Sequence, residues 1–277
     1  MNKCPNCLNK SIKKIYVYSK PDTYEKKIKI FYNKSSHNKR CWYVCKICNF
    51  HFSNYLFFKK DVMKSIYKKL YRKIDLTNIY QFEKFLKLPL KVSMNKQRVK
   101  YIKNNIDDLY DKKILKFKTG HHLDLGGGSG IFSILFKDKK WNSEVMDIAQ
   151  ENILSKKNNI KYISKNIYDL KKPLGKKYDL ITIIDTLEHI KNFKKFLINV
   201  KKFLLDKKGL IFIDCPGNFN FGRKKISNDI FNSCHYSMWC ANSFSHLANT
   251  LDFEIIRFDI SHYEKDFYGF KVLMINK

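Results

Sequence analysis

The sequence has little arginine or alanine, and it has no long apolar stretch. No apolar run approaches the roughly 18 residues that a membrane-spanning helix needs. The first residues, Met1 to Cys7, also lack the apolar core of about 7 to 15 residues that a secretory signal carries. We therefore expect a protein without a membrane span that resides in the cytoplasm.

The scarcity of arginine bears on the charge of the chain, which is formally +30 at pH 7. Such a charge suits a nucleic-acid or anionic-membrane partner, because clustered basic side chains neutralise phosphates. Nucleic-acid sites favour arginine, however, and the chain has five arginines against fifty lysines spread along its length. With 25 asparagines and three alanines, the composition is typical of an AT-rich genome. We assign the lysines to a solvated surface and keep a nucleic-acid partner as an alternative.

The chain holds enough apolar residues to fold, since 44% are hydrophobic and 15% aromatic. Its 277 residues suit one α/β domain with a small accessory module, because single cores rarely grow beyond about 250 to 300 residues. We predict a zinc-ribbon-like module over 1–58, a helical linker or lid over 59–112, and a Rossmann-like α/β domain over 113–277.

Four of the eight cysteines form two Cys-x-x-Cys pairs, which favours a metal site in a reducing compartment. The pairs are Cys4 with Cys7 and Cys45 with Cys48. Two such turns close one tetrahedral site, so we predict a structural Zn²⁺ held by four thiolates. The 37 residues between the pairs are many for a compact ribbon, and Cys41, His37 or His51 is an alternative ligand. A redox role is a further alternative, although neither pair lies in a thioredoxin-like context.

From Gly120 onward, short apolar runs alternate with longer amphipathic ones. This rhythm predicts parallel strands joined by crossover helices. The predicted strands are 121–125, 144–148, 160–167, 178–185 and 209–215, followed by 253–260 and 267–275. The last two are separated by a short polar loop, so we expect a mostly parallel seven-stranded sheet with an antiparallel edge strand.

The strongest motif is Asp124-Leu125-Gly126-Gly127-Gly128-Ser129-Gly130, at the end of the first of these strands. Its glycines allow a sharp turn and a close approach of the backbone to a ligand. A dinucleotide fingerprint needs Gly or Ala where this chain has Ile131, so NAD is disfavoured. The spacing instead resembles the first motif of class I S-adenosylmethionine-dependent methyltransferases, over roughly residues 115–277. The resemblance implies S-adenosylmethionine (SAM) as the cofactor and methyl transfer as the activity.

The same resemblance implies a set of cofactor-binding residues. They are Asp124, Gly126, Gly128, Gly130, Asp147, Asn166, Ile167 and Asp185. Asp147 follows the second strand and is placed to accept the ribose hydroxyls, whereas Asn166 and Ile167 follow the third, beside the adenine. A helix N-cap before 149–153 is the alternative for Asp147, and a plain strand-end turn is the alternative for Asn166.

The segment Leu187-Glu188-His189 resembles the motif that follows the fourth strand in small-molecule methyltransferases, including ubiquinone-type O-methyltransferases. His235-Tyr236 similarly resembles their substrate-side loop. The resemblance implies Glu188, His189 and His235 as catalytic residues, because an imidazole is a suitable base for removing the acceptor's proton. A solvated helix start for Glu188 and His189, and a packed structural role for His235, are the alternatives.

The preferred hypothesis is O-methylation of a small polar metabolite, such as a sugar, a sugar nucleotide or a phosphorylated intermediate of polysaccharide or natural-product biosynthesis. An RNA or protein methyltransferase that docks its polymer on the basic zinc module is the first alternative. A non-catalytic scaffold is the second. In a variant of the mechanism, Asp185, Glu188, His189 and His235 hold a divalent ion against the acceptor. The acceptor atom and the oligomeric state stay open.

Overall fold

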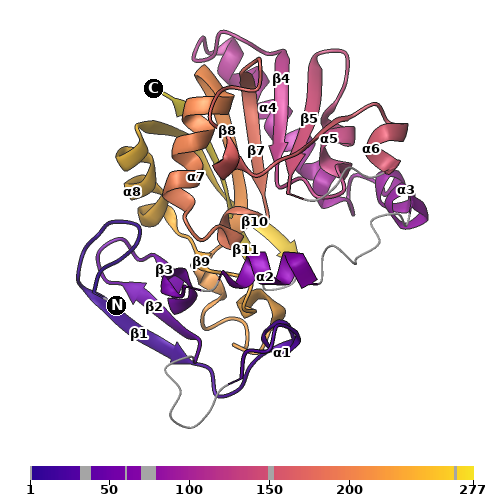
Figure 1. The fold of residues 1–277 in the computed structure, drawn as a ribbon. Helices are drawn as coiled ribbons and strands as arrows, with labels where there is room; N and C mark the ends of the chain where they lie inside the picture. The colour runs from indigo at the N-terminus through magenta and orange to yellow at the C-terminus, as the bar shows by residue number, and fades with distance from the viewer. Residues whose placement is uncertain (1, 32–38, 60, 70–78, 149–152, 265–266) are drawn as a thin grey trace. The chain divides into compact units, whose positions relative to one another are not determined.

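The structure is a computed structural model that describes residues 2–31, 39–59, 61–69, 79–148, 153–264 and 267–277 (Figure 1). Within these residues the strands form a seven-stranded and a four-stranded sheet. The larger sheet comprises β4 (Gly120–Leu125), β5 (Trp141–Asp147), β6 (Lys161–Ser164), β7 (Tyr178–Ile184), β8 (Leu205–Pro216), β10 (Phe253–Glu264) and β11 (Phe267–Asn276).

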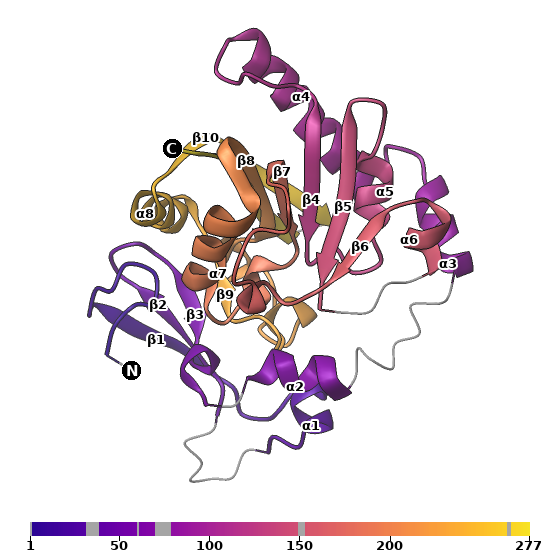
Figure 2. The same ribbon diagram turned by 45° about the horizontal axis from the view of Figure 1, so that its top comes forward.

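The larger sheet has the strand order β10-β11-β8-β7-β4-β5-β6. Strand β4 pairs in parallel with β5 and with β7, and β5 pairs in parallel with β6, so that these four strands lie side by side in Figure 2. The residues of β7 are almost all buried, as expected for a parallel strand covered on both faces. The predicted Rossmann-like sheet with an antiparallel edge is confirmed.

The third predicted strand, 160–167, is too long. Strand β6 ends at Ser164, because Asn166 starts a short 3₁₀ helix, η3 (Ile167–Asp169). The Asn166 side chain accepts a hydrogen bond at 3.0 Å from the backbone N–H of Tyr168. Such a cap satisfies backbone donors that a strand would pair with its neighbour.

Helices α2, α3 and α4 lie in the segment predicted to be helical, 59–112, of which residues 60 and 70–78 are outside the description. The α-helices of the described residues are α1 (Thr23–Lys27), α2 (Val62–Lys69), α3 (Ile79–Lys87), α4 (Met94–Asp111), α5 (Ile131–Phe136), α6 (Ile153–Lys157), α7 (Phe193–Asn199) and α8 (Ala241–Leu251). Helix α4 buries Arg98, Ile102, Ile106 and Leu109, whose spacing of three to four residues forms one face. Short helical turns include η1 (Asn54–Phe57) and η4 (Leu187–His189).

The smaller sheet joins the N-terminal strands to a segment far along the chain. Its strands are β1 (Ile12–Val17), β2 (Cys41–Cys45), β3 (His51–Ser53) and β9 (Ser237–Met238), in that order. The core beside them contains Tyr18 and Trp42 together with Ile230, Phe231 and Met238. The N-terminal strands therefore share both a sheet and a core with residues 230–238.

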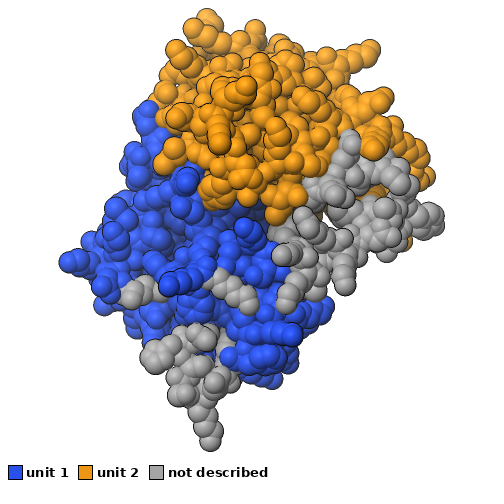
Figure 3. All heavy atoms as spheres, viewed as in Figure 1, with its two compact units in different colours: residues 1–74, 185–195, 214–271 blue, residues 75–184, 196–213, 272–277 orange. Residues whose placement is uncertain are grey.

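The chain divides into two compact units (Figure 3). Unit 1 comprises residues 1–74, 185–195 and 214–271, and unit 2 comprises residues 75–184, 196–213 and 272–277. The predicted division at residues 58 and 112 remains a prediction, because compactness does not measure which segments fold alone. Among the described helices, none combines the length and the apolar character needed to cross a bilayer.

Candidate functional site

The glycine motif forms a left-handed loop between β4 and α5 in unit 2. The φ angles of Gly126, Gly128 and Gly130 are 77°, 52° and 78°, a region that only glycine enters at little cost. Gly130 is the N-cap residue of α5. A Cβ atom built on Gly128 would meet no atom of the described residues within 4 Å, so the described part of the chain leaves the backbone open at this position.

Asp124 lies behind this loop rather than on its outer side. It is 2% exposed, and its Oδ2 would lie 2.5 Å from a Cβ atom built on Gly127. The Thr182 hydroxyl donates to Asp124 Oδ1 at 2.6 Å. A carboxylate in this position supports the loop from within the sheet.

A buried histidine extends this contact. His122 Nε2 lies 2.9 Å from Thr182 Oγ1, and His122 Nδ1 lies 2.7 Å from Ser143 Oγ. Because the Thr182 hydroxyl already donates to Asp124, we assign the His122 proton to Nε2 and the acceptor role to Nδ1. Burial lowers the pKa of His122 to about 3, so the ring is neutral near pH 7. A chain of hydrogen bonds thus runs from Ser143 to Asp124.

Asp147 ties the second strand to the glycine loop. It ends β5, is 6% exposed, and its Oδ2 accepts a hydrogen bond from the Gly128 N–H at 3.0 Å. The Tyr162 hydroxyl donates to the Gly128 carbonyl at 2.9 Å. Both backbone groups of Gly128 are therefore held in place. The alternative of a helix cap by Asp147 rests partly on residues 149–152, which lie outside the description.

The other predicted cofactor residues have different surroundings. The Asn166 side chain caps η3 and Ile167 is buried, both in unit 2. Asp185, in unit 1, is exposed and has a φ of 47°, and its N–H donates to the Asp214 carbonyl at 2.8 Å. Aspartate tolerates this left-handed conformation better than most residues, and such positions cluster at functional sites.

Two histidines of unit 1 lie together, with ring centroids 4.7 Å apart. His189 Nδ1 lies 3.1 Å from the Cys234 carbonyl, and His235 Nδ1 lies 2.5 Å from the Ile230 carbonyl. A carbonyl only accepts, so we assign the proton of each ring to Nδ1, which leaves a lone pair on each Nε2. Burial lowers the pKa of His189 to about 4 and holds that of His235 well below its ordinary value. Both rings are neutral near pH 7 and able to accept a proton or bind a metal.

Glu188 completes a group of three with these histidines. It is 1% exposed, and its Oε1 lies 4.0 Å from His189 Nε2. One ligand atom from each of the three residues lies within 4.8 Å of the others. Asp185, predicted as a fourth ligand, is not among this group of the described residues. The three donors suit a divalent cation, or a base with a neighbouring carboxylate.

The four predicted zinc ligands also come together, in unit 1. Their sulfur atoms all lie within 4.8 Å of one another, with Cys4 and Cys48 at 3.7 Å and Cys7 and Cys45 at 3.5 Å. Four sulfurs at about 2.3 Å from a tetrahedral Zn²⁺ would be about 3.8 Å apart. The residues present therefore fit this ion. Among the proposed alternatives, Cys41 and His51 contact backbone carbonyls instead, and His37 lies outside the description.

A lysine offsets the charge of the cysteine cluster. Lys194 Nζ donates to the Asn6 carbonyl inside the first Cys-x-x-Cys turn. Burial lowers the pKa of Lys194, whereas the nearby Cys4, Cys7 and Cys48 raise it. One positive charge at this position would offset half of the net charge of −2 that four thiolates and one Zn²⁺ carry.

A model of the methyltransferase domain family matches residues 94–257, which is more than half of the chain. The chain belongs to this family. The predicted SAM-dependent methyltransferase is confirmed at the level of the family.

The relatives of this methyltransferase include enzymes named for different acceptor atoms. The ubiquinone biosynthesis O-methyltransferase of Rickettsia akari is 28% identical over 149 residues, which cover 51% of this chain and 57% of the relative. The (S)-coclaurine N-methyltransferase of Thalictrum flavum is 28% identical over 125 residues, 41% of this chain and 34% of the relative. These matches span about half or less of either protein's length, and they leave the acceptor atom open.

Solved structures agree with the fold of the methyltransferase. The magnesium protoporphyrin IX methyltransferase of Synechocystis, solved with S-adenosylhomocysteine (SAH) bound, has a TM-score of 0.52 at 14% identity and covers 76% of this chain and 100% of that one. Coclaurine N-methyltransferase, bound to N-methylheliamine and SAH, has a TM-score of 0.51 at 11% identity and covers 78% and 82%. At such identities the likeness shows the fold alone.

Sequence reasoning missed the residues that support the site of the methyltransferase. His122 precedes Asp124 by two positions on a strand, so both side chains share a face, and Asp124 is in register with Thr182. That period-two pattern was available in the sequence. Asp22 and Arg40 carried no sequence signal, because Asp22 contacts Ser233, which is remote in the chain, and Arg40 in turn contacts Asp22.

Proposed function

We propose that this methyltransferase transfers the methyl group of SAM to an oxygen atom of a small polar metabolite, with His189 or His235 as the base. The observation that carries this proposal is the imidazole pair. Each ring has its Nδ1 at a backbone carbonyl, and each is neutral because burial depresses its pKa. Because the proton of each ring is on Nδ1, each Nε2 keeps a lone pair that would accept the proton of an acceptor hydroxyl.

The glycine loop and the strands beside it would hold SAM, which supplies a methyl group on a sulfonium with a neutral leaving thioether. Gly126, Gly128 and Gly130 would line its methionine side. Asp147 would accept the ribose hydroxyls, and Asn166 and Ile167 would lie near the adenine. The support for this proposal is the left-handed, sterically open backbone at Gly128 and the buried carboxylate fixed beside it.

The two histidines and the methyltransferase family support a hydroxyl oxygen as the acceptor atom. Methyl transfer to a hydroxyl needs the acceptor oxygen in line with the methyl carbon and its proton removed. Glu188, His189 and His235 also fit a divalent ion, which would lower the pKa of an acceptor hydroxyl. A sugar, a sugar nucleotide or a phosphorylated intermediate remains the preferred substrate class, and the O-methyltransferase relatives support the choice of oxygen. Structural zinc in the cysteine cluster and a cytoplasmic location are part of the same proposal.

The cofactor site is tested with a matched pair of glycine variants. Gly128 and Gly175 have φ values of 52° and 87°, and a Cβ atom on either would meet none of the described residues within 4 Å. Both Gly→Ala changes therefore strain the backbone to a similar extent, by about 1 to 3 kcal/mol. Gly175 precedes β7 and Gly128 follows β4, so the two lie toward opposite ends of these parallel strands. We expect weaker SAM binding in Gly128→Ala but not in Gly175→Ala; equal binding by both would contradict the proposed site.

The acceptor is tested by incubating the protein with radiolabelled SAM and separate sets of sugars, sugar nucleotides, RNA and protein. Label in a small hydroxyl compound is the expected result. Label in RNA, with affinity that falls steeply as salt increases, would favour the polymer alternative. A protein that binds neither SAM nor SAH would be a scaffold, and the proposal would be wrong.

A further inference from the structure

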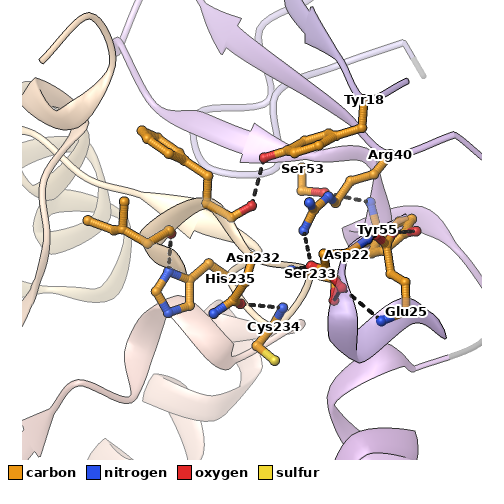
Figure 4. Close-up of polar contacts among 12 residues, drawn as sticks. Tyr18, Asp22, Glu25, Arg40, Ser53, Tyr55, Asn232, Ser233, Cys234 and His235 are labelled. Atoms are coloured by element: carbon orange, nitrogen blue, oxygen red, sulfur yellow. Dashed lines mark hydrogen bonds and ion pairs between the residues drawn. The ribbon is translucent and has the colours of Figure 1, made fainter. Parts of the chain in front are cut away.

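One carboxylate of the N-terminal segment, that of Asp22, contacts the loop that carries His235 (residues 230–236, the 230s loop; Figure 4). Asp22 Oδ2 accepts a hydrogen bond from the Ser233 N–H at 2.6 Å, and Asp22 Oδ1 lies 3.1 Å from the Ser233 hydroxyl. Arg40 Nη1 donates to Asp22 Oδ2 at 3.2 Å. Asp22 also caps α1 by accepting from the Glu25 N–H at 2.8 Å. One carboxylate thus joins α1, the buried Arg40 and the 230s loop.

Further contacts hold the same loop on both sides of His235. The Tyr18 hydroxyl donates to the Phe231 carbonyl at 2.6 Å, while the Arg40 guanidinium lies over the Tyr18 ring at 3.7 Å. After His235, the Ser53 N–H donates to the Tyr236 carbonyl at 2.8 Å, and β3 then pairs with β9. The N-terminal segment therefore fixes the backbone before and after the histidine.

The backbone held in this way is the part that orients both imidazoles. The Ile230 carbonyl accepts from His235, and the Cys234 carbonyl accepts from His189. Ser233, which is completely buried, lies between these two carbonyls in the sequence and is bound to Asp22. A shift of Ser233 would move one or both carbonyls, and the rings would lose the partners that fix their protons on Nδ1.

We propose that Asp22 is a positioning residue of the methyltransferase, which holds the 230s loop so that His189 and His235 keep their Nδ1–H tautomers. The N-terminal segment then serves catalysis through this contact, in addition to any metal that its cysteines bind. The catalytic part of this inference rests on the proposed function, whereas the tautomers of the two histidines are a property of the folded chain alone. Ser233 and Arg40 act with Asp22, because both contact the same carboxylate.

The test compares Asp22→Ala and Asp22→Asn with Asp138→Ala. Asp138 is a matched control, because its carboxylate also accepts two backbone N–H groups, from Lys140 and Trp141, and pairs with a lysine, Lys103. Full-length protein labelled with ¹⁵N-histidine reports the tautomer of each ring, with His189→Gln and His235→Gln variants to assign the signals. The kcat, the KM for the acceptor and the Kd for SAM are measured on the same samples.

We expect the wild type and Asp138→Ala to show Nδ1–H tautomers for His189 and His235. In Asp22→Ala the His235 signal should shift toward a mixture of tautomers, and kcat should fall tenfold or more, since a misplacement of about 1 Å costs up to roughly a hundredfold. The Kd for SAM should change less than about twofold. Asp22→Asn keeps the shape but has one acceptor oxygen in place of two, so it should lie clearly between the wild type and Asp22→Ala in both properties.

Unchanged tautomers and unchanged kcat in folded Asp22→Ala would overturn the inference. If Asp22→Ala does not fold, the test uses Asp22→Asn. A wild-type histidine spectrum in Asp22→Asn, with a loss of kcat as small as that of Asp138→Ala, would overturn the inference. A wild type that methylates no acceptor would refute the proposed function instead. In that case the histidine spectra still show whether Asp22 holds the loop.

Discussion

Replacing His122 by glutamine should remove part of the acid sensitivity of this protein. His122 is completely buried, and burial lowers its pKa from 6.5 to about 3. In the unfolded chain the ring takes a proton below about pH 6.5, whereas in the folded chain it does so only near pH 3. Protonation of His122 in the unfolded chain therefore leaves the free energy of unfolding unchanged above about pH 6.5 and lowers it as the pH falls from 6.5 toward 3.

The magnitude follows from the separation of the two pKa values. At pH 5 the pH lies about 1.5 units below the pKa of the unfolded ring, so proton binding stabilises the unfolded state. This lowers the free energy of unfolding by about 2 kcal/mol. His122→Gln removes this titration and keeps an N–H that is able to donate to Thr182. It loses the hydrogen bond with Ser143, so it should be less stable at pH 7 by about 1 kcal/mol.

Urea unfolding at pH 7 and pH 5, followed by circular dichroism, measures the difference. The loss of unfolding free energy between the two pH values should be smaller by about 2 kcal/mol in His122→Gln than in the wild type. His121→Gln is the matched control, because His121 is the neighbouring residue of β4 and is exposed. Parallel losses in the wild type and His122→Gln would refute the assignment of a buried, neutral ring beneath the glycine loop.

Two further predictions concern the metal and the imidazoles. Elemental analysis of reduced protein should find about one zinc per chain, and native protein free of zinc would contradict this. Cys48→Ser should lose the zinc and the order of the N-terminal strands while SAM still binds. His189→Ala should lose roughly a hundredfold or more in turnover with SAM affinity retained, and EDTA should leave wild-type activity unchanged as long as zinc stays in the cysteine cluster. Inhibition by EDTA under that condition would favour the divalent-ion mechanism. Full turnover in the double variant His189→Ala/His235→Ala would exclude both the imidazole base and the divalent-ion mechanism.

The parts of the fold that depend on local patterns were predictable from the sequence. Helix α8 follows such a pattern, because its buried apolar residues recur at helical spacing and Asp252 ends it in a left-handed conformation. The strands of the parallel sheet were recognisable as short apolar runs, and only the capping side chain of Asn166 made one of them shorter than expected. The Cys-x-x-Cys spacing alone likewise predicted that the four cysteines lie close together.

Contacts between remote segments were not predictable. Strand β3 pairs with β9 across more than 180 residues, and Asp22 reaches Ser233 over a separation of 211. No periodicity in either segment marks its partner, since two-residue strands and single carboxylates carry little pattern. The sequence could therefore identify His189 and His235 as candidates, but not the backbone carbonyls that select their tautomers.

Calorimetric titration of SAM into the wild type and Asp147→Ala tests the central claim most directly. The wild type should bind one SAM per chain. Asp147→Ala should bind at least about tenfold more weakly, because it loses a charged acceptor whose hydrogen bonds contribute about 1.5 to 3 kcal/mol. A wild type that binds no SAM, or equal affinities in the two proteins, would contradict the assignment of this chain's glycine loop and Asp147 as the cofactor site of a methyltransferase.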